Sequence, residues 1–256
     1  MITINNNMYV LDTDNTSYAF AVLGSGQLEH LYYGRKLHAN EAVMTEKHTF
    51  IPGNTNVYNK DYSSYSLEDV CLEMSSLGKG DIREPFIEVT YPNGSSTTDM
   101  VFDRAEIIQG KEEYDTLPGS YDDNGEVEQL VIYLKDRNYN LTLELHYYVY
   151  EKCDIITRSA KLVNSGNESV RLERLMSMQL DLNESDYELS FFNGAWAREM
   201  NRSRIPIRAG KYVNESVTGT SSNRANPFFM IGRSSTTEDY GECYGFNLIY
   251  SGNHYE

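Results

Sequence analysis

Apolar and polar residues alternate along most of this chain, and residues 140–150, NLTLELHYYVY, show the pattern most clearly. Successive side chains of a β-strand point to opposite faces of the sheet, so a period of two predicts a strand. One predicted face is apolar and aromatic and holds Leu141, Leu143, Leu145, Tyr147 and Val149. The opposite face is expected to be polar and holds Thr142, Glu144, His146 and Tyr148.

Similar short apolar runs recur through the chain without an intervening helical period. Turn signals separate them, such as Asp14-Asn15, Gly24-Ser25-Gly26 and Pro92-Asn93-Gly94. Strands of this length joined by short turns predict an all-β fold, an antiparallel sandwich or barrel with few or no long helices. The other predicted strands cover residues 2–12, 17–23, 28–34, 87–91, 98–108, 128–135, 155–164, 170–180 and 241–252.

Residues 39–66 break this pattern, because Gly, Asn, Ser and Tyr dominate there and no period is sustained. A loop of this length in a compact domain is usually functional or disordered. Its recurrent aromatic residues favour a functional or interface loop. The candidate ligand contacts in it are Lys47 and His48.

Residues 67–88 hold a second concentration of polar side chains. Paired carboxylates can perform acid–base chemistry, and the candidates here are Glu68, Asp69, Glu73, Asp81 and Glu84. The alternative is structural, and we favour it, since neighbouring charges of opposite sign are ordinary surface features. In that interpretation Asp81 and Glu84 order Lys79 and Arg83 at the entrance to a strand.

Net charge narrows the classes of function. The 256 residues carry a formal charge of −16, with 40% apolar and 23% charged residues, which is typical of a globular protein. Contacts to phosphates need a basic surface, so the charge argues against nucleic acid and against an anionic membrane surface. The negative charge is compatible with a neutral ligand such as a sugar. The 21 tyrosines favour strands and ligand-facing surfaces.

The cysteines and histidines form no metal or cofactor motif. Cys71, Cys153 and Cys243 lie far apart and predict reduced thiols in a cytosolic protein. We interpret His30 as a core residue, and His146 has no acidic or cysteine partner at motif spacing, so we do not propose it as a base. We see no signal peptide pattern and no apolar run long enough to cross a membrane.

The stretch at 191–202, FFNGAWAREMNR, is the best candidate for a binding site. It contains Trp196, the only tryptophan, after the turn signal Asn193-Gly194 and before Arg198 and Glu199. A lone tryptophan is often a packing residue, because the indole buries a large apolar area. Here an aromatic face beside an arginine and a glutamate predicts a pocket for a polar ligand.

Several segments occur in an order that closely resembles one known family. They are LEHLYYG, LGKGDIREP, YEKCDIITRSAKLVNSG, LMSMQLDL, NGAWARE, GTSSNRANPFF and GECYGFNLIYSGNH. With this order the chain resembles the N-terminal region of bacterial α-galactosidases of glycoside hydrolase family 36, over essentially its whole length.

The resemblance implies an architecture in which this chain is one part. Such enzymes have an N-terminal, galactose-mutarotase-like β-supersandwich, a (β/α)₈ barrel with both catalytic aspartates, and a C-terminal β-domain. Residues 1–256 are then an incomplete N-terminal β-supersandwich domain without the barrel or the C-terminal domain. The chain also ends directly after a strand signal, which suggests a cut through a larger protein. The implied activity is retaining hydrolysis of terminal α-galactose from substrates such as melibiose and raffinose, without a cofactor.

The resemblance also assigns a role to the tryptophan stretch. In the family this loop reaches an active site, often that of a neighbouring subunit in a homotetramer, and the residue matching Trp196 contacts the sugar. Arg198 and Glu199 are expected to position the loop or to bind hydroxyls. The early loop approaches the ligand in some members, and here it carries Glu46, Lys47 and His48.

Two alternatives of different classes remain open at this point. One is a stand-alone β-sandwich module that binds carbohydrate or another protein. The other is a separate enzyme that uses acidic residues within this chain, such as an epimerase-like sandwich.

Overall fold

The computed structural model covers residues 1–256 and describes all of them except 39–55, 64–65 and 183–184. The chain forms two compact units. Unit 1 contains residues 1–112 and 121–182, and unit 2 contains residues 113–120 and 183–256. Among the described residues the only helices are three short turns, η1 (Lys60–Tyr62), η2 (Leu67–Asp69) and η3 (Glu151–Cys153). The predicted all-β fold is therefore confirmed.

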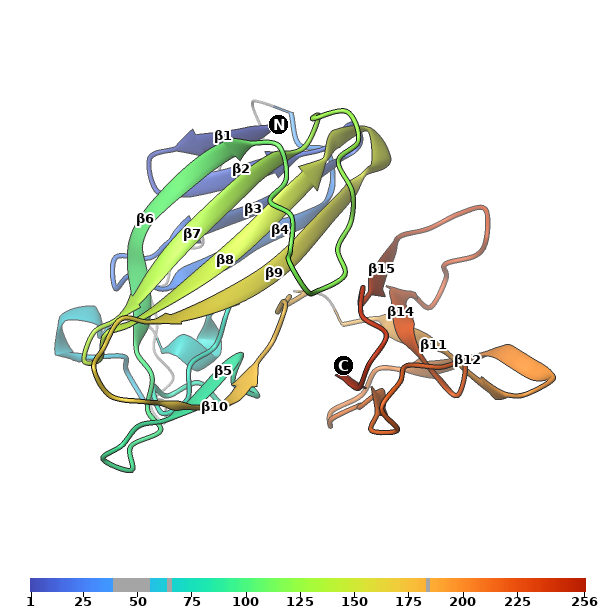
Figure 1. The fold of residues 1–256 in the computed structure, drawn as a ribbon. Coiled ribbons are helices and arrows are strands. Elements are labelled where there is room, and N and C mark those ends of the chain that lie inside the picture. The colour runs from blue at the N-terminus through green and yellow to red at the C-terminus, as the bar shows by residue number, and fades with distance from the viewer. Residues whose placement is uncertain (39–55, 64–65, 183–184) are drawn as a thin grey trace. The chain divides into compact units, whose positions relative to one another are not determined.

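Unit 1 is built from two four-stranded antiparallel sheets and a two-stranded ribbon (Figure 1). The first sheet contains β1 (Ile2–Asn5), β2 (Met8–Asp12), β3 (Thr16–Val22) and β4 (Leu28–Arg35). The second contains β6 (Met100–Gln109), β7 (Glu128–Asp136), β8 (Leu141–Tyr150) and β9 (Ile155–Asn164). The ribbon pairs β5 (Ile87–Thr90) with β10 (Arg171–Leu175). Each strand in both large sheets pairs with its neighbour in sequence.

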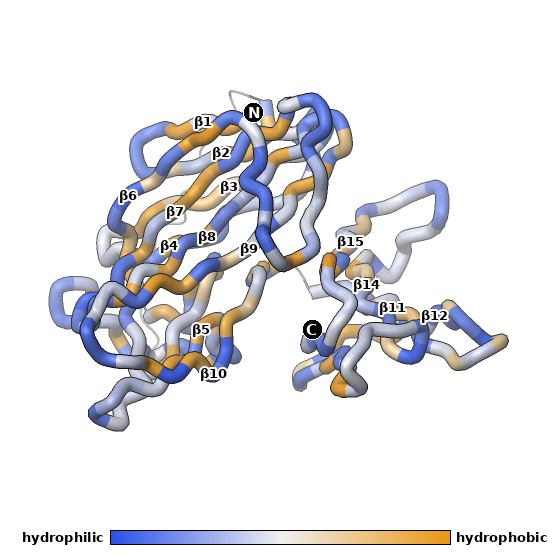
Figure 2. The backbone as a smooth tube through the Cα atoms, in the orientation of Figure 1, coloured by the Kyte–Doolittle hydropathy of each residue, from blue (hydrophilic) through white to orange (hydrophobic). Residues whose placement is uncertain are grey.

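The core of unit 1 lies between the two large sheets. Tyr9 of β2 stacks on Phe20 of β3 with ring centroids 5.0 Å apart, and Phe20 stacks on Tyr147 of β8 at 5.2 Å. The predicted apolar face of β8 is buried throughout, which confirms that part of the pattern. Figure 2 shows hydrophobic and hydrophilic segments alternating along these strands.

The second face of β8 carries the polar residues that the pattern predicts, but it is not exposed along its C-terminal half. His146 and Tyr148 are buried as well. His146 Nδ1 lies 2.9 Å from Gln129 Nε2, and its Nε2 lies 3.4 Å from a Glu144 oxygen. Burial lowers the pKa of His146. His146 therefore lies beside Glu144, an acid two residues away on the same strand face. This spacing matches no catalytic motif.

Unit 2 contains a four-stranded sheet in the order β12-β11-β14-β15. These strands are β11 (Tyr187–Ala195), β12 (Arg198–Pro206), β14 (Ala225–Arg233) and β15 (Cys243–Asn247). A small ribbon pairs β13 (Glu215–Ser216) with β16 (His254–Tyr255). The tryptophan stretch therefore forms the hairpin between β11 and β12.

Candidate functional site

Trp196 lies at the tip of the β11–β12 hairpin. Ala195 pairs with Arg198, so only Trp196 and Ala197 form the turn. The Trp196 side chain is 92% exposed. An indole of this size is rarely left in water, because burying it against apolar surface is favourable by a few kcal/mol (about 1.5–3 for large side chains). Such exposure leaves the ring accessible to a ligand or a partner, the role that the sequence predicts for it.

The turn consists of Trp196 and Ala197, so it lies beyond the Asn193-Gly194 pair that the sequence marked as the turn signal. Asn193 pairs with Asn201 inside the hairpin, and Gly194 opposes the two residues Glu199 and Met200, which is a β-bulge. A Cβ at Gly194 would collide with the Arg198 carbonyl oxygen. The glycine is needed for close approach of two backbones at a bulge.

Two residues of the hairpin tip have left-handed backbone conformations without being glycine. They are Ala197, with φ of 61°, and Met200, with φ of 55°. Each such residue costs roughly 1–2 kcal/mol. Strain of this kind collects at sites where a fixed side-chain direction is useful. The tip therefore holds Trp196 in a defined, outward position.

Arg198 and Glu199 have different surroundings in the hairpin. One carboxylate oxygen of Glu199 accepts a hydrogen bond of 2.7 Å from the Ala197 N–H and so closes the turn. The Arg198 carbonyl accepts from Asn201 Nδ2 at 2.6 Å. In the described part of the chain the structure records no ion pair between Arg198 and Glu199. The Arg198 guanidinium is exposed and available to a ligand.

The other two predicted contact residues, Lys47 and His48, lie outside the described residues. Their part in a site stays a prediction, as do the sugar contacts of Trp196, Arg198 and Glu199. The structure does place these last three residues together on one hairpin.

We predict that Gly194→Ala disrupts this tip without unfolding the protein. The added methyl group would displace the Arg198 carbonyl and with it the bulge that orients Trp196. Amide exchange at residues 195–201 should accelerate at least tenfold, while exchange in β8 stays unchanged. Gly245→Ala, whose added methyl group would make an ordinary contact of 3.5 Å with the Phe228 ring, is a matched control on β15 of unit 2. Unchanged exchange at the tip would contradict the proposed role of Gly194.

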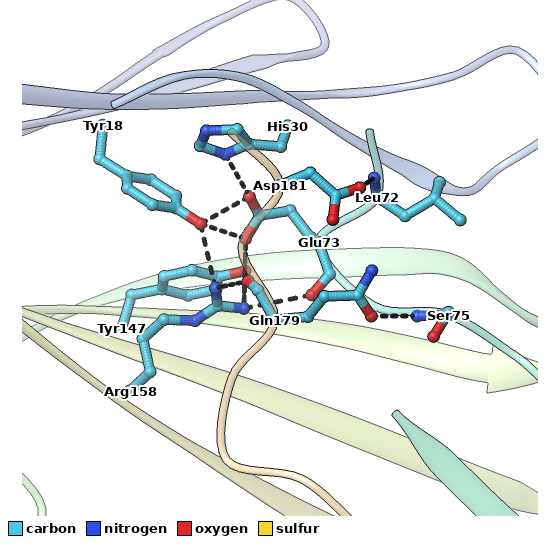
Figure 3. Close-up of polar contacts among 9 residues, drawn as sticks. All are labelled: Tyr18, His30, Leu72, Glu73, Ser75, Tyr147, Arg158, Gln179 and Asp181. Carbon is cyan, nitrogen blue, oxygen red and sulfur yellow. Dashed lines mark hydrogen bonds and ion pairs between the residues drawn. The ribbon is translucent and has the colours of Figure 1, made fainter. Parts of the chain in front are cut away.

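A second cluster of chemically capable groups lies inside unit 1 around Glu73 (Figure 3). The Glu73 carboxylate accepts hydrogen bonds from the hydroxyls of Tyr18 at 2.6 Å and Tyr147 at 2.7 Å. His30 Nδ1 lies 2.8 Å from it, and an Arg158 guanidinium nitrogen lies 3.2 Å from it. Strands β3, β4, β8 and β9 each supply one of these four partners.

The electrostatics of this cluster hold Glu73 as an anion. Burial alone would raise the pKa of Glu73, but the charge of Arg158 and hydrogen bonds from His30 and Tyr18 outweigh it and lower the pKa. Burial raises the pKa of both tyrosines well above the ordinary value, so their hydroxyls remain donors. Glu73 is fully buried, and its oxygens are occupied by protein donors. A carboxylate in this state is structural and does not reach a substrate.

The cluster also fixes the segment that follows β10. Arg158 donates to the Gln179 carbonyl at 2.8 Å, and the Gln179 side-chain oxygen accepts from the Ser75 N–H at 2.9 Å. An Asp181 oxygen accepts from the Leu72 N–H at 3.2 Å. Residues 179–181 are thus attached by side chains to residues 72–75, as Figure 3 shows. This explains why β10 ends at Leu175, short of the predicted limit at residue 180.

The structure supports the structural alternative for the acidic residues at 67–88. Asp81 pairs with Arg83 at 2.9 Å, as expected. Glu84 does not pair with Lys79 or Arg83; it pairs with Arg174 at 2.6 Å. Lys79 pairs instead with Asp99 at 3.1 Å. His30 is buried and bonded to Glu73, which confirms it as a core residue. The sequence could not reveal Arg158, Arg174 and Asp99 as partners, because they lie far along the chain, on β9, on β10 and just before β6.

Two features are absent from the part of the chain that the structure describes. No helix in it is long and apolar enough to span a bilayer. No group of three or more His, Cys, Asp or Glu side chains in it is arranged to hold a metal ion.

Comparison with known proteins identifies the family. The model of the glycosyl hydrolase family 36 N-terminal domain matches residues 26–256. The chain belongs to glycoside hydrolase family 36. Alpha-galactosidase AgaA of Geobacillus stearothermophilus is 35% identical to this family 36 chain over 249 residues, which is 95% of the chain and 33% of AgaA. Alpha-galactosidase Mel36A of Lactobacillus acidophilus is 34% identical, over 97% of the chain and 34% of Mel36A.

Solved structures of family 36 enzymes agree with the fold. A crystal structure of a Geobacillus stearothermophilus AgaA variant in complex with raffinose matches with a TM-score of 0.90 and 32% identity. That match covers 96% of this chain and 34% of the AgaA chain. The family 36 chain described here therefore spans about a third of the length of its relatives. It corresponds to their N-terminal domain, as the resemblance predicted.

Proposed function

We propose that this chain is the N-terminal part of a retaining α-galactosidase that releases terminal α-linked galactose from oligosaccharides of the melibiose and raffinose type. The observation that carries the proposal is the family match across residues 26–256. The raffinose complex of AgaA, an enzyme of the same family, supports the substrate class.

In this proposal the chain shapes the substrate site and does not supply the chemistry. Retaining hydrolysis needs two carboxylates about 5–5.5 Å apart on either side of the anomeric carbon. The acid with the most hydrogen-bond donors around it, Glu73, is sealed in the core. The catalytic pair would thus belong to a (β/α)₈ barrel in the part of the enzyme that residues 1–256 do not include. A C-terminal β-domain would complete the enzyme, and residues 1–256 would be part of its N-terminal β-supersandwich.

The hairpin tip would form one wall of the sugar site. Trp196 offers an exposed ring on which the C–H face of galactose can stack. The Arg198 guanidinium would donate to sugar hydroxyls, while Glu199 keeps the turn closed. Lys47 and His48 would add polar contacts from the early loop.

Assembly and location follow from the same proposal. A projecting tip with a 92% exposed tryptophan suits insertion into the active site of a neighbouring subunit, as in a homotetramer. The three cysteines, Cys71, Cys153 and Cys243, lie far apart in the sequence and match no disulfide framework, which supports a reducing, cytoplasmic compartment.

Hydrolysis of a chromogenic α-galactoside tests the division of labour. The 256-residue chain is expected to give no turnover above buffer, whereas a full-length enzyme that begins with this sequence hydrolyses the substrate. The missing carboxylates are the physical reason. Turnover by the 256-residue chain, abolished by substitution of one of its own acids, would place catalysis within this chain and refute the proposal.

A second function is favoured by the exposed tryptophan itself. A stand-alone carbohydrate-binding module would also display an aromatic platform on a β-hairpin. It predicts that the isolated chain binds galactose with millimolar or tighter affinity and that Trp196→Ala abolishes the binding. An α-galactosidase part that needs the rest of its site predicts no measurable affinity.

A further inference from the structure

Strand β11 is paired irregularly on both of its sides just below the Trp196 tip. On the side of β12, the bulge described above places Met200 as an extra residue opposite Gly194. On the side of β14, Phe192 alone opposes the three residues 226–228, which is a second bulge. Bulges bend a strand and change the direction of its side chains, and they are common next to active sites. These two bulges therefore determine the direction in which the tip leaves the sheet.

The two bulges are joined to each other by a side-chain contact. Asn226 Nδ2 donates a hydrogen bond to Met200 Sδ at 3.3 Å. In the order β12-β11-β14, strand β11 lies between the two bulged strands, so this bond links its neighbours across it (Figure 1). Met200 has a left-handed backbone with φ of 55°, a conformation that persists only where the surroundings hold it. The bond from Asn226 is one such restraint.

Asn226 is itself fixed within unit 2. Pro227 follows it, and a residue before proline is confined to extended conformations. Asn214 Nδ2 donates to the Asn226 carbonyl at 2.8 Å and to a carboxylate oxygen of Glu256 at 2.7 Å. The backbones of Asn214 and Glu256 also exchange two hydrogen bonds of 2.9 Å. The Asn226 side chain thus extends toward Met200 from a well-restrained base.

The direction of the Trp196 ring depends on this base. A side chain that is 92% exposed has little packing to hold it, so its position comes from the backbone below it. Met200 belongs to that backbone, four residues after Trp196 on the same hairpin. A displacement of about 1 Å at a substrate contact can lower a reaction rate about a hundredfold.

We propose that Asn226 is a positioning residue for the sugar site. Its bond to Met200 joins the two bulges and holds the hairpin tip so that Trp196 meets the substrate at a fixed angle. Asn226 acts through Met200 and does not touch the sugar. The inference rests on the proposed function for the sugar, whereas the restraint on the tip can be measured without any substrate.

Amide exchange in the 256-residue chain tests the restraint. Asn226→Ala should accelerate exchange at residues 195–201 about three- to tenfold, as the loss of one hydrogen bond does, and leave exchange in β8 unchanged. Asn253→Ala is the matched control, because the Asn253 side chain accepts a 2.7 Å bond from the Gly219 N–H on another loop of unit 2. Exchange at the tip that is unchanged in Asn226→Ala, or equally fast in both variants, would overturn the proposal.

A double-mutant cycle tests whether Asn226 acts through Met200. Met200→Leu keeps the size of the side chain and removes the sulfur acceptor. It should accelerate exchange at the tip as Asn226→Ala does, and the double variant should be no faster than either single variant, because the two residues share one bond. Additive effects would show that Asn226 acts by another route and would contradict the proposal.

The kcat/KM for melibiose of a full-length enzyme that begins with this sequence tests the effect on the sugar site. Asn226→Ala should lower it about three- to tenfold, and should cause no further loss in a Trp196→Ala background. An unchanged kcat/KM, or equal losses in the two backgrounds, would refute the positioning role, since a general structural defect does not depend on Trp196. An enzyme that hydrolyses no α-galactoside would refute the proposed function instead, and the exchange measurements would still decide whether Asn226 holds the tip.

Discussion

Arg158→Leu is expected to lower the free energy of unfolding of this chain by about 3–5 kcal/mol, the cost of leaving a buried charge without its partner. Four groups contact Glu73. Arg158 is the only one of them that stays positively charged throughout the ordinary pH range. Without it, two tyrosine hydroxyls and His30 would have to hold a carboxylate that is fully buried. The Gln179 carbonyl would also lose its donor. Urea unfolding followed by circular dichroism measures the change.

Arg171→Leu is the matched control for this experiment. Arg171 pairs with Glu173 at 3.0 Å, but its side chain is 78% exposed, compared with 5% for Arg158. An exposed ion pair contributes about 0–1 kcal/mol, so this variant should unfold nearly as the unchanged chain does. Similar losses for the two variants would show that the Glu73 cluster tolerates an unpaired charge. A further loss on acidification is not expected for Arg158→Leu, since protonation of Glu73 removes the unpaired charge.

The Glu73 cluster shows where sequence patterns stop being informative. Alternation along β8 correctly placed Tyr147 in the core, because a period of two determines the face of each side chain. Glu73 lies in an irregular segment with no period, so nothing local indicated that its side chain points inward. Its partners come from four strands far apart in sequence. Only the packing of two sheets brings these residues together.

The hairpin shows a different limit of prediction. The sequence identified the stretch around Trp196, but Asn193-Gly194 predicted a turn three residues too early. Glycine occurs both in tight turns and where two backbones approach closely, and its presence in the sequence does not distinguish these two roles. In the structure Gly194 takes the second role, and the turn uses Ala197 in a left-handed conformation that alanine seldom adopts. This departure from the usual backbone preference of alanine is of a kind that is common at functional sites.

The strands of unit 1 were predictable to within a few residues, with two exceptions, whereas the sequence did not delimit β11, β12 and β14 of unit 2. β1 was not separated from β2, because the turn between them uses Asn6 with a positive φ instead of glycine or proline. β10 was predicted too long, because side chains of Gln179 and Asp181 replace the backbone pairing that would have extended it. Backbone pairing leaves a period in the sequence, whereas single side-chain contacts do not.

Trp196→Ala should reduce kcat/KM for melibiose roughly 10- to 100-fold in a full-length enzyme that begins with this sequence. Stacking a sugar on a large ring is expected to contribute about 1.5–3 kcal/mol, and each 1.36 kcal/mol corresponds to a factor of ten in rate. The Tm should stay unchanged, because a side chain that is 92% exposed contributes little to folding. A loss of activity without a loss of stability is the signature that separates a sugar contact from a packing role.

Two further variants sharpen this experiment. Trp196→Phe keeps an aromatic face and should recover part of the activity, since stacking depends on the ring and not on the indole N–H. Tyr240→Ala removes another exposed ring, 78% exposed, from a different loop of unit 2 and should leave kcat/KM unchanged. If Trp196→Ala and Tyr240→Ala have the same kcat/KM as the unmodified enzyme, the hairpin tip does not touch the substrate. A fall in the Tm of Trp196→Ala in the full-length enzyme would instead assign the ring a packing role.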